Sequence, residues 1–110
     1  MAVEILKEKC IGCGMCKEGC FSGARIICGR EMTAEEIFEQ ILEDKAYYFS
    51  DGGVTFSGGE PLIYPEVIKE LIKKCKAENI NTAAETSLAL FDDELLGQLD
   101  LVMADFKIFD

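Results

Sequence analysis

The sequence predicts an α/β fold in which three short strands alternate with amphipathic helices. The strand candidates are residues 54–57, 81–85 and 101–104, and the segments between them place apolar side chains at helical spacing. Because strands joined through helices pair in parallel with right-handed crossovers, we expect a parallel βαβαβ sheet. A cysteine-rich loop precedes this part, so we expect two domains, residues 1–30 and 31–110.

A capping box predicts where the first helix begins. The Thr33 hydroxyl can accept a hydrogen bond from the third backbone N–H of the helix, while the Glu36 side chain reaches back. The apolar side chains that follow form one stripe, made of Ile37, Phe38, Ile41 and Leu42. A turn at residues 50–53 separates this helix from the first strand. Upstream, residues 25–28 are a candidate short strand.

Two prolines mark the second helix. Pro61 and Pro65 bracket its entry. The apolar residues that then recur at helical spacing are Val67, Ile68, Leu71, Ile72 and Cys75. A lone thiol on an apolar helix face is typical of a core residue, so we expect Cys75 to be buried. Asp92 is the expected N-cap of a third, short helix, whose inward side chains are Leu95, Leu96 and Leu99.

Composition excludes several classes of function. The 110 residues carry a net charge of −10 and contain no histidine, which excludes histidine metal ligands, histidine bases and Ser-His or Cys-His nucleophiles. Nucleic-acid binding is disfavoured because no Lys/Arg cluster is present to contact phosphates. The sequence has neither a recognisable signal peptide nor an apolar run of about 20 residues that could span a membrane. Since clustered thiols need reducing conditions, we expect a cytoplasmic protein with no membrane partner.

Four cysteines form the tightest motif in the chain. Cys10, Cys13, Cys16 and Cys20 follow the spacing C-x2-C-x2-C-x3-C, typical of bacterial ferredoxins whose fourth cysteine serves a second cluster. Zinc sites usually divide their ligands between two separated pairs, so we expect an iron–sulfur cluster, with zinc and structural thiols as alternatives. Cys28 is either a spare thiol or a further ligand.

Polar residues follow each predicted strand at its carboxyl end. The three clusters are Ser57-Gly58-Gly59-Glu60, Glu85-Thr86-Ser87, and Asp105 with Lys107. Since ligands of parallel α/β proteins bind outside the carboxyl ends of the strands, we expect all three clusters to line one site. The two glycines would let a ligand or backbone approach closely, and Glu60 would accept from a cationic group. The alternatives are an ordinary turn at the glycines and helix caps at Glu85 and Asp105.

Together these motifs resemble a known family. The string Gly52-Gly-Val-Thr-Phe-Ser-Gly-Gly-Glu-Pro-Leu62, followed by Glu85-Thr86-Ser87 and Asp105-Phe106-Lys107, is similar to the radical S-adenosylmethionine (SAM) activating enzymes of glycyl radical enzymes. The cysteine loop from Lys9 onward resembles the second half of a ferredoxin-like insert that many relatives carry. The resemblance implies that the chain is part of a radical-SAM (β/α)6 partial barrel preceded by this ferredoxin-like loop.

The resemblance also implies roles for the candidate residues. Those that would hold the amino group of S-adenosylmethionine are Ser57, Gly58, Gly59 and Glu60. The element that contacts the same ligand corresponds to Asp105 and Lys107. The positions that bind a monovalent cation in some relatives correspond to Glu85, Thr86, the Met103 carbonyl and Asp105. The residues that would bind an auxiliary [4Fe–4S] cluster are Cys10, Cys13 and Cys16.

The family's reaction is the reductive cleavage of S-adenosylmethionine, after which the 5′-deoxyadenosyl radical abstracts hydrogen from a glycine of a partner enzyme. The resemblance therefore implies two partners, a glycyl radical enzyme of the pyruvate formate-lyase type and a reductant such as flavodoxin or ferredoxin.

Several departures from the family pattern limit what this chain is expected to do alone. The C-x3-C-x2-C loop that binds the catalytic cluster is absent. Cys16 and Cys20 have the first spacing of this motif, but Gly23 stands where its third cysteine would be. The first ferredoxin run is absent too, Phe21 replaces the usual proline, and Leu88 stands where relatives usually have glycine. We therefore expect an internal fragment that supplies part of the S-adenosylmethionine pocket but is inactive alone. The alternatives are a single-cluster electron-transfer or binding module, and a metal-free fold fragment that oligomerises through an exposed sheet edge.

Overall fold

The computed structural model describes residues 6–106 of the chain. The chain divides into two compact units after Glu31. Within the described residues, the second unit contains a parallel sheet of three strands connected through helices. The predicted parallel α/β fold is therefore confirmed.

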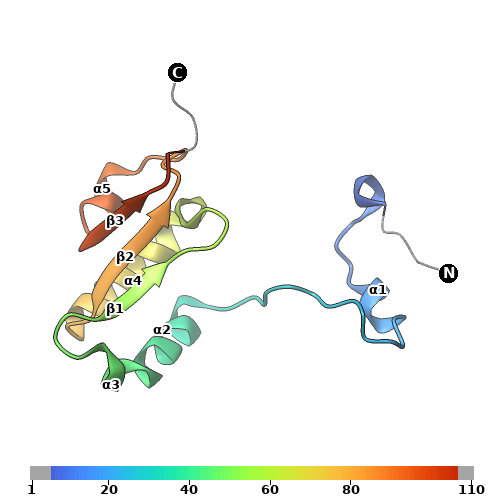
Figure 1. The fold of residues 1–110 in the computed structure, drawn as a ribbon, viewed down its shortest axis with the longest axis horizontal. Helices are drawn as coiled ribbons and strands as arrows, with labels where there is room; N and C mark the ends of the chain where they lie inside the picture. The colour runs from blue at the N-terminus through green and yellow to red at the C-terminus, as the bar shows by residue number, and fades with distance from the viewer. Residues whose placement is uncertain (1–5, 107–110) are drawn as a thin grey trace. The chain divides into compact units, whose positions relative to one another are not determined.

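The second unit follows the predicted order of strand, helix, strand, helix and strand. Its elements are α2 (Ala34–Glu43), α3 (Lys45–Tyr48), β1 (Gly53–Phe56), the 3-10 helix η2 (Pro61–Ile63), α4 (Pro65–Ala77), β2 (Asn81–Thr86), α5 (Asp93–Leu96) and β3 (Leu101–Ala104) (Figure 1). The spatial order of the strands is β1-β2-β3. The register pairs Phe56 with Ala84 and Thr86 with Ala104, so the carboxyl ends of the strands lie at one edge of the sheet.

The predicted start of α2 is confirmed. The hydroxyl oxygen of Thr33 accepts from the backbone N–H of Glu36 at 3.2 Å, and the Thr33 N–H donates to the Glu36 carboxylate at 2.7 Å. Caps of this kind stabilise a helix by about 1 kcal/mol. On the predicted apolar stripe Phe38 and Ile41 are buried, whereas Leu42 lies at its exposed edge.

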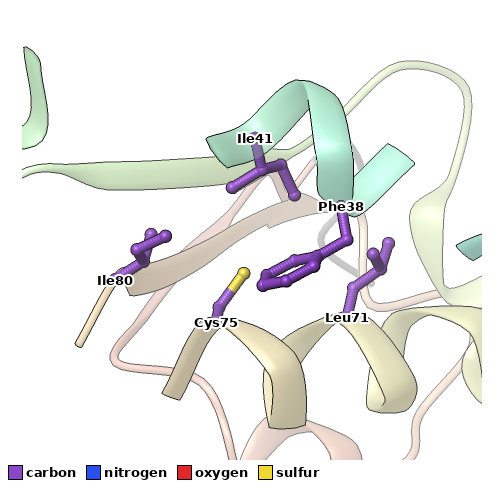
Figure 2. Close-up of a cluster of buried hydrophobic side chains, with 5 residues drawn as sticks. All are labelled: Phe38, Ile41, Leu71, Cys75 and Ile80. Carbon is purple, nitrogen blue, oxygen red and sulfur yellow. The ribbon is translucent and has the colours of Figure 1, made fainter. Parts of the chain in front are cut away.

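One hydrophobic cluster joins α2 to α4 and to the sheet. Figure 2 shows Phe38 and Ile41 of α2 facing Leu71 and Cys75 of α4, with Ile80, the residue directly before β2, beside them. Cys75 is fully buried, as predicted, and this burial raises the pKa of its thiol. Val54 and Phe56 of β1 pack against the same cluster.

A second hydrophobic cluster lies under the loops that follow the strands. It consists of Leu62 in η2, Ile68 and Ile72 in α4, and Leu95 in α5. Leu88, in the loop after β2, packs against it. This cluster therefore anchors η2 and the loop after β2 to one side of α4.

The two faces of the sheet differ. In β2 the side chains of Thr82, Ala84 and Thr86 are buried, while the alternate residues Asn81 and Glu85 are exposed and Ala83 is partly exposed. Since alternate residues of a strand point to opposite faces, the buried set lies on the face toward the helices. In Figure 1, α4 lies behind the sheet. The exposed set, including Glu85, lies on the other face.

The prediction of a strand at residues 25–28 is wrong. This segment has no regular secondary structure, and Ile26 and Ile27 are exposed. A strand needs a neighbouring strand to satisfy its backbone groups, and the described residues of the first unit contain none. That unit contains instead the 3-10 helix η1 (Lys7–Lys9) and the one-turn helix α1 (Met15–Glu18), which the sequence pattern did not predict.

We predict that Gly53→Ala destabilises the sheet by about 1–3 kcal/mol or more, because overpacking forces backbone shifts. A Cβ at Gly53 would lie 1.9 Å from the carbonyl oxygen of Asn81, its partner on β2. The measurement is urea denaturation followed by far-UV circular dichroism. The control is Gly97→Ala, where the Cβ would lie 3.2 Å from the Asp93 oxygen and the backbone is already right-handed. Equal stability of both variants would contradict the prediction.

Candidate functional site

A pocket of about 280 Å³ lies at the carboxyl edge of the sheet. Its lining residues are Ser57, Gly58, Gly59, Glu85, Thr86, Ser87 and Asp105. They come from the ends of β1, β2 and β3, so the convergence of the three polar clusters predicted from the sequence is observed. Among the predicted site residues, Glu60 does not line the pocket and Lys107 lies outside the described residues.

A somewhat larger pocket, of about 360 Å³, lies at the amino edge of the same strands. Two acidic residues, Asp51 and Asp100, line it. Asp100 is held by Thr82, whose backbone N–H donates to its carboxylate at 2.7 Å and whose hydroxyl lies at 3.1 Å. These hydrogen bonds lower the pKa of Asp100. Asp100 therefore connects β3 to β2, and the carboxyl edge, with its glycine loop, is the better candidate site.

The glycine loop after β1 depends on backbone conformation. Gly58 and Gly59 have φ angles of 77° and 56°, in the left-handed region that other residues rarely adopt. A Cβ on either glycine would meet no described atom within 4 Å. Their side of the loop therefore faces open space, and the need for glycine arises from φ and not from crowding by the rest of the chain.

The Glu60 carboxylate ties this loop to the end of β2. One oxygen, Oε1, accepts from the Thr86 hydroxyl at 2.6 Å and from the Leu62 N–H at 3.3 Å. The other, Oε2, accepts from the Ser87 hydroxyl at 2.6 Å and from the Ser87 N–H at 3.0 Å. The side-chain hydrogen bonds from Ser87 and Thr86 are the main reason that the pKa of Glu60 falls to about 2.

The turn after β2 is held by the same side chains. The Thr86 hydroxyl oxygen accepts from the N–H of Leu88 at 3.0 Å, and the Ser87 hydroxyl oxygen accepts from the N–H of Ala89 at 3.3 Å. Leu88 has a φ of 57°. A glycine would adopt this conformation without strain, whereas leucine adopts it only at a cost in backbone energy. Asp105 completes the site, because its N–H donates to the Thr86 carbonyl at 2.9 Å.

Sequence reasoning placed Ser87 in the right cluster but missed its function in the structure. Ser87 supplies two of the four hydrogen bonds to Glu60, through its hydroxyl and its backbone N–H. The only signal in the sequence is a hydroxyl residue directly after a strand, which is common in turns. Its pairing with Glu60, 27 residues away, depends on the parallel register of β1 and β2.

The cysteine run lies in the first unit. Cys10, Cys13 and Cys16 are exposed, and Cys20 is half-buried with its thiol 3.5 Å from the Ser22 hydroxyl. The hydrogen bond with Ser22 is the main cause of a lowered pKa at Cys20. Between Leu6 and Phe106, no three His, Cys, Asp or Glu side chains lie close enough together to hold a metal ion.

The donor set nevertheless fits an iron–sulfur cluster chemically. Its members are thiolate-forming side chains in one short loop, which is the ligand type that such clusters require. Gly12 and Gly14 both have positive φ angles, 70° and 78°, so the loop between the cysteines turns tightly. The role of the four cysteines as ligands stays a prediction.

These features define a class of protein, a parallel α/β protein with a glycine-turn ligand site at the carboxyl edge of its sheet. The chain belongs to the radical SAM superfamily, which it matches over residues 8–103. Members of this superfamily use a [4Fe–4S] cluster and S-adenosylmethionine. No helix within residues 6–106 has the length and apolar character needed to cross a membrane.

Proteins with similar sequences include several activating enzymes. The chain is 44% identical to the pyruvate formate-lyase-activating enzyme of Clostridium pasteurianum over 85 residues, which are 74% of this chain and 36% of the relative. It is 36% identical to the 4-hydroxyphenylacetate decarboxylase activating enzyme of Clostridioides difficile (strain 630), over 86% of this chain and 31% of the relative.

A third relative is matched over nearly the whole chain. The (2S)-3-sulfopropanediol dehydratase activating enzyme of Klebsiella oxytoca is 39% identical over 97% of this chain and 35% of the relative. The chain thus spans about a third of the length of these relatives. The predicted resemblance to the activating enzymes of glycyl radical enzymes is confirmed by these matches.

We predict that the Glu60 carboxylate stabilises the folded chain in a pH-dependent manner. A carboxyl group with a lowered pKa contributes stability above its unfolded pKa, and this contribution is lost as the pH falls toward the folded pKa. For Glu60 this window runs from the usual value of 4.5 down to about 2. The difference in free energy of unfolding between the wild type and Glu60→Gln should therefore be constant near neutral pH and shrink across this window.

The measurement is urea denaturation of both proteins at a series of pH values. The control is Glu66→Gln, which changes an exposed glutamate on α4. A difference between wild type and Glu60→Gln that stays constant from neutral to strongly acidic pH would contradict the prediction.

Proposed function

We propose that this chain is the part of a glycyl-radical-enzyme activating enzyme that forms one side of the S-adenosylmethionine site. The observation that carries the proposal is the pocket in which the glycine loop after β1 meets the acidic ends of β2 and β3, in a chain of the radical SAM superfamily. The names of the relatives support the same function, since each is an activating enzyme.

In this proposal the residues of the chain bind and orient S-adenosylmethionine. Gly58 and Gly59 expose backbone groups to the pocket, and the absence of side chains lets a ligand approach them. Glu85 and Asp105 give the pocket two carboxylates, which suit either the ammonium group of the ligand or a bound monovalent cation. Ser57, Thr86 and Lys107 are the remaining candidates for contact with the ligand.

Cys10, Cys13 and Cys16 are the proposed ligands of an auxiliary [4Fe–4S] cluster, which supplies one-electron chemistry when bound. Cys20, with its thiol held by Ser22, would serve a second cluster. We further propose that the chain alone does not cleave S-adenosylmethionine, because its sequence lacks the C-x3-C-x2-C motif. The proposed partners are a glycyl radical enzyme and a reductant such as flavodoxin or ferredoxin, in the cytoplasm.

A second candidate function is electron transfer through a single cluster. The observation that favours it is the self-contained cysteine run, which needs no residue of the second unit. The two functions differ in whether the chain binds S-adenosylmethionine, because an electron-transfer module does not require this ligand.

For the cluster, we predict that anaerobic reconstitution loads iron and sulfide onto the wild type and that Cys13→Ser loses most of both. The matched comparison is Cys28→Ser, which changes an exposed cysteine outside the run and should retain the cluster. Iron and sulfide analysis with electron paramagnetic resonance provides the measurement. Adding S-adenosylmethionine should leave the spectrum of the cluster unchanged. A clear spectral change would contradict the proposed inactivity, and equal iron in Cys13→Ser would contradict the ligand assignment.

For the pocket, we predict that the chain binds S-adenosylmethionine and that Asp105→Asn weakens binding by about tenfold or more, the usual effect of losing a hydrogen bond to a charged group. The control is Asp51→Asn, which removes the same charge at the amino edge of the sheet. Isothermal titration calorimetry measures both affinities. An equal effect of the two substitutions would place the ligand elsewhere.

A further inference from the structure

The capacity of the Glu60 carboxylate to accept hydrogen bonds is already filled within the chain. An ionised carboxylate offers about four lone-pair sites. Glu60 receives four hydrogen bonds, at 2.6 to 3.3 Å, two on each oxygen. The donors come from Leu62, which follows the glycine loop, from Thr86, the last residue of β2, and from Ser87, directly after it.

Glu60 also lies behind the wall of the pocket. Gly59, directly before it, lines the pocket, and so do Thr86 and Ser87, its partners. Glu60 itself does not, and its side chain is only partly exposed. The acidic residues that line the pocket are Glu85 and Asp105.

We propose that Glu60 is a positioning residue, which fixes the glycine loop to the end of β2 and makes no contact with the bound ligand. This inference rests on the proposed function, because it names how one residue of the S-adenosylmethionine site acts. It replaces the role that the family resemblance implied for Glu60, which was to hold the amino group of S-adenosylmethionine directly.

We call Glu60, with its hydrogen bonds to Leu62, Thr86 and Ser87, the clamp. The need for it follows from the backbone conformation of the two segments that it joins. The loop before Glu60 contains two consecutive glycines, which lose much conformational freedom when they are ordered. The turn after Thr86 contains Leu88 with a positive φ, a conformation that must be held by its surroundings. One carboxylate that binds both segments orders them before any ligand arrives, and preorganisation of this kind raises affinity.

The first test uses the ligand-free chain. Carboxyl carbon resonances of the glutamates are followed by NMR as a function of pH, and the resonance of Glu60 should titrate with a pKa of about 2. Thr86→Val removes the hydroxyl donor and should raise this pKa, while the matched variant Thr86→Ser keeps the donor and should leave it low. A Glu60 that titrates at its usual value of 4.5 in the wild type would overturn the clamp.

The second test adds S-adenosylmethionine at neutral pH. The carboxyl resonances of Glu85 and Asp105 should shift on binding, while that of Glu60 stays in place. Glu60→Gln should speed hydrogen exchange at the Ser87 amide in the ligand-free chain and weaken binding by about tenfold, since the glutamine NH2 group cannot accept from that amide. A shift of the Glu60 resonance as large as that of Glu85 would show direct contact and overturn the proposal.

The two tests separate the failure of this inference from the failure of the proposed function. If the wild type does not bind S-adenosylmethionine, the proposed function is contradicted, and the ligand-free titration of Glu60 still decides whether the clamp exists. If the wild type binds and Glu60 titrates normally, the proposed function stands and the clamp is wrong.

Discussion

The parallel pairing of β1, β2 and β3 is the constraint on which the rest of the structure depends. Parallel strands require a crossover through a helix, and the register here places Phe56 beside Ala84 and Thr86 beside Ala104. The paired positions of neighbouring strands are 28 and 18 residues apart in the sequence, yet the residues that follow these strands reach one edge of the sheet. A one-residue slip of β2 would turn Glu85 toward the helices and Thr86 toward solvent, and the pocket would lose its polar wall.

The two hydrophobic clusters fix the positions of the helices and loops relative to the sheet. Leu71 and Cys75 face α2 and β1 from one side of α4, while Ile68 and Ile72 face η2 and α5 from the other. Both sets belong to one helix with apolar residues at helical spacing, so a single element buries its apolar surface on two sides. The loops at the carboxyl edge are thereby held by the core as well as by hydrogen bonds.

Much of this arrangement is predictable from the sequence because the signals are local. The capping box at Thr33, the apolar spacing in α4 and the glycine loop after β1 each lie within a few residues of the feature they specify. What the sequence could not predict depends on tertiary placement. The strand expected at 25–28 lacks a neighbour to pair with, and the saturation of Glu60 needs donors from a segment 26 or 27 residues away. The clustering of the four cysteines likewise stays a prediction from their spacing.

Leu88 links the turn that forms one wall of the pocket to the hydrophobic core. Its left-handed backbone costs about 1–2 kcal/mol relative to a right-handed one. Part of this strain is balanced by the packing of its side chain against the cluster around Leu95. A glycine at this position would form the same turn without touching the core. With leucine, the shape of the turn and the packing of α5 are energetically coupled, so a change in the volume of Leu95 is transmitted to the Thr86-Ser87 wall.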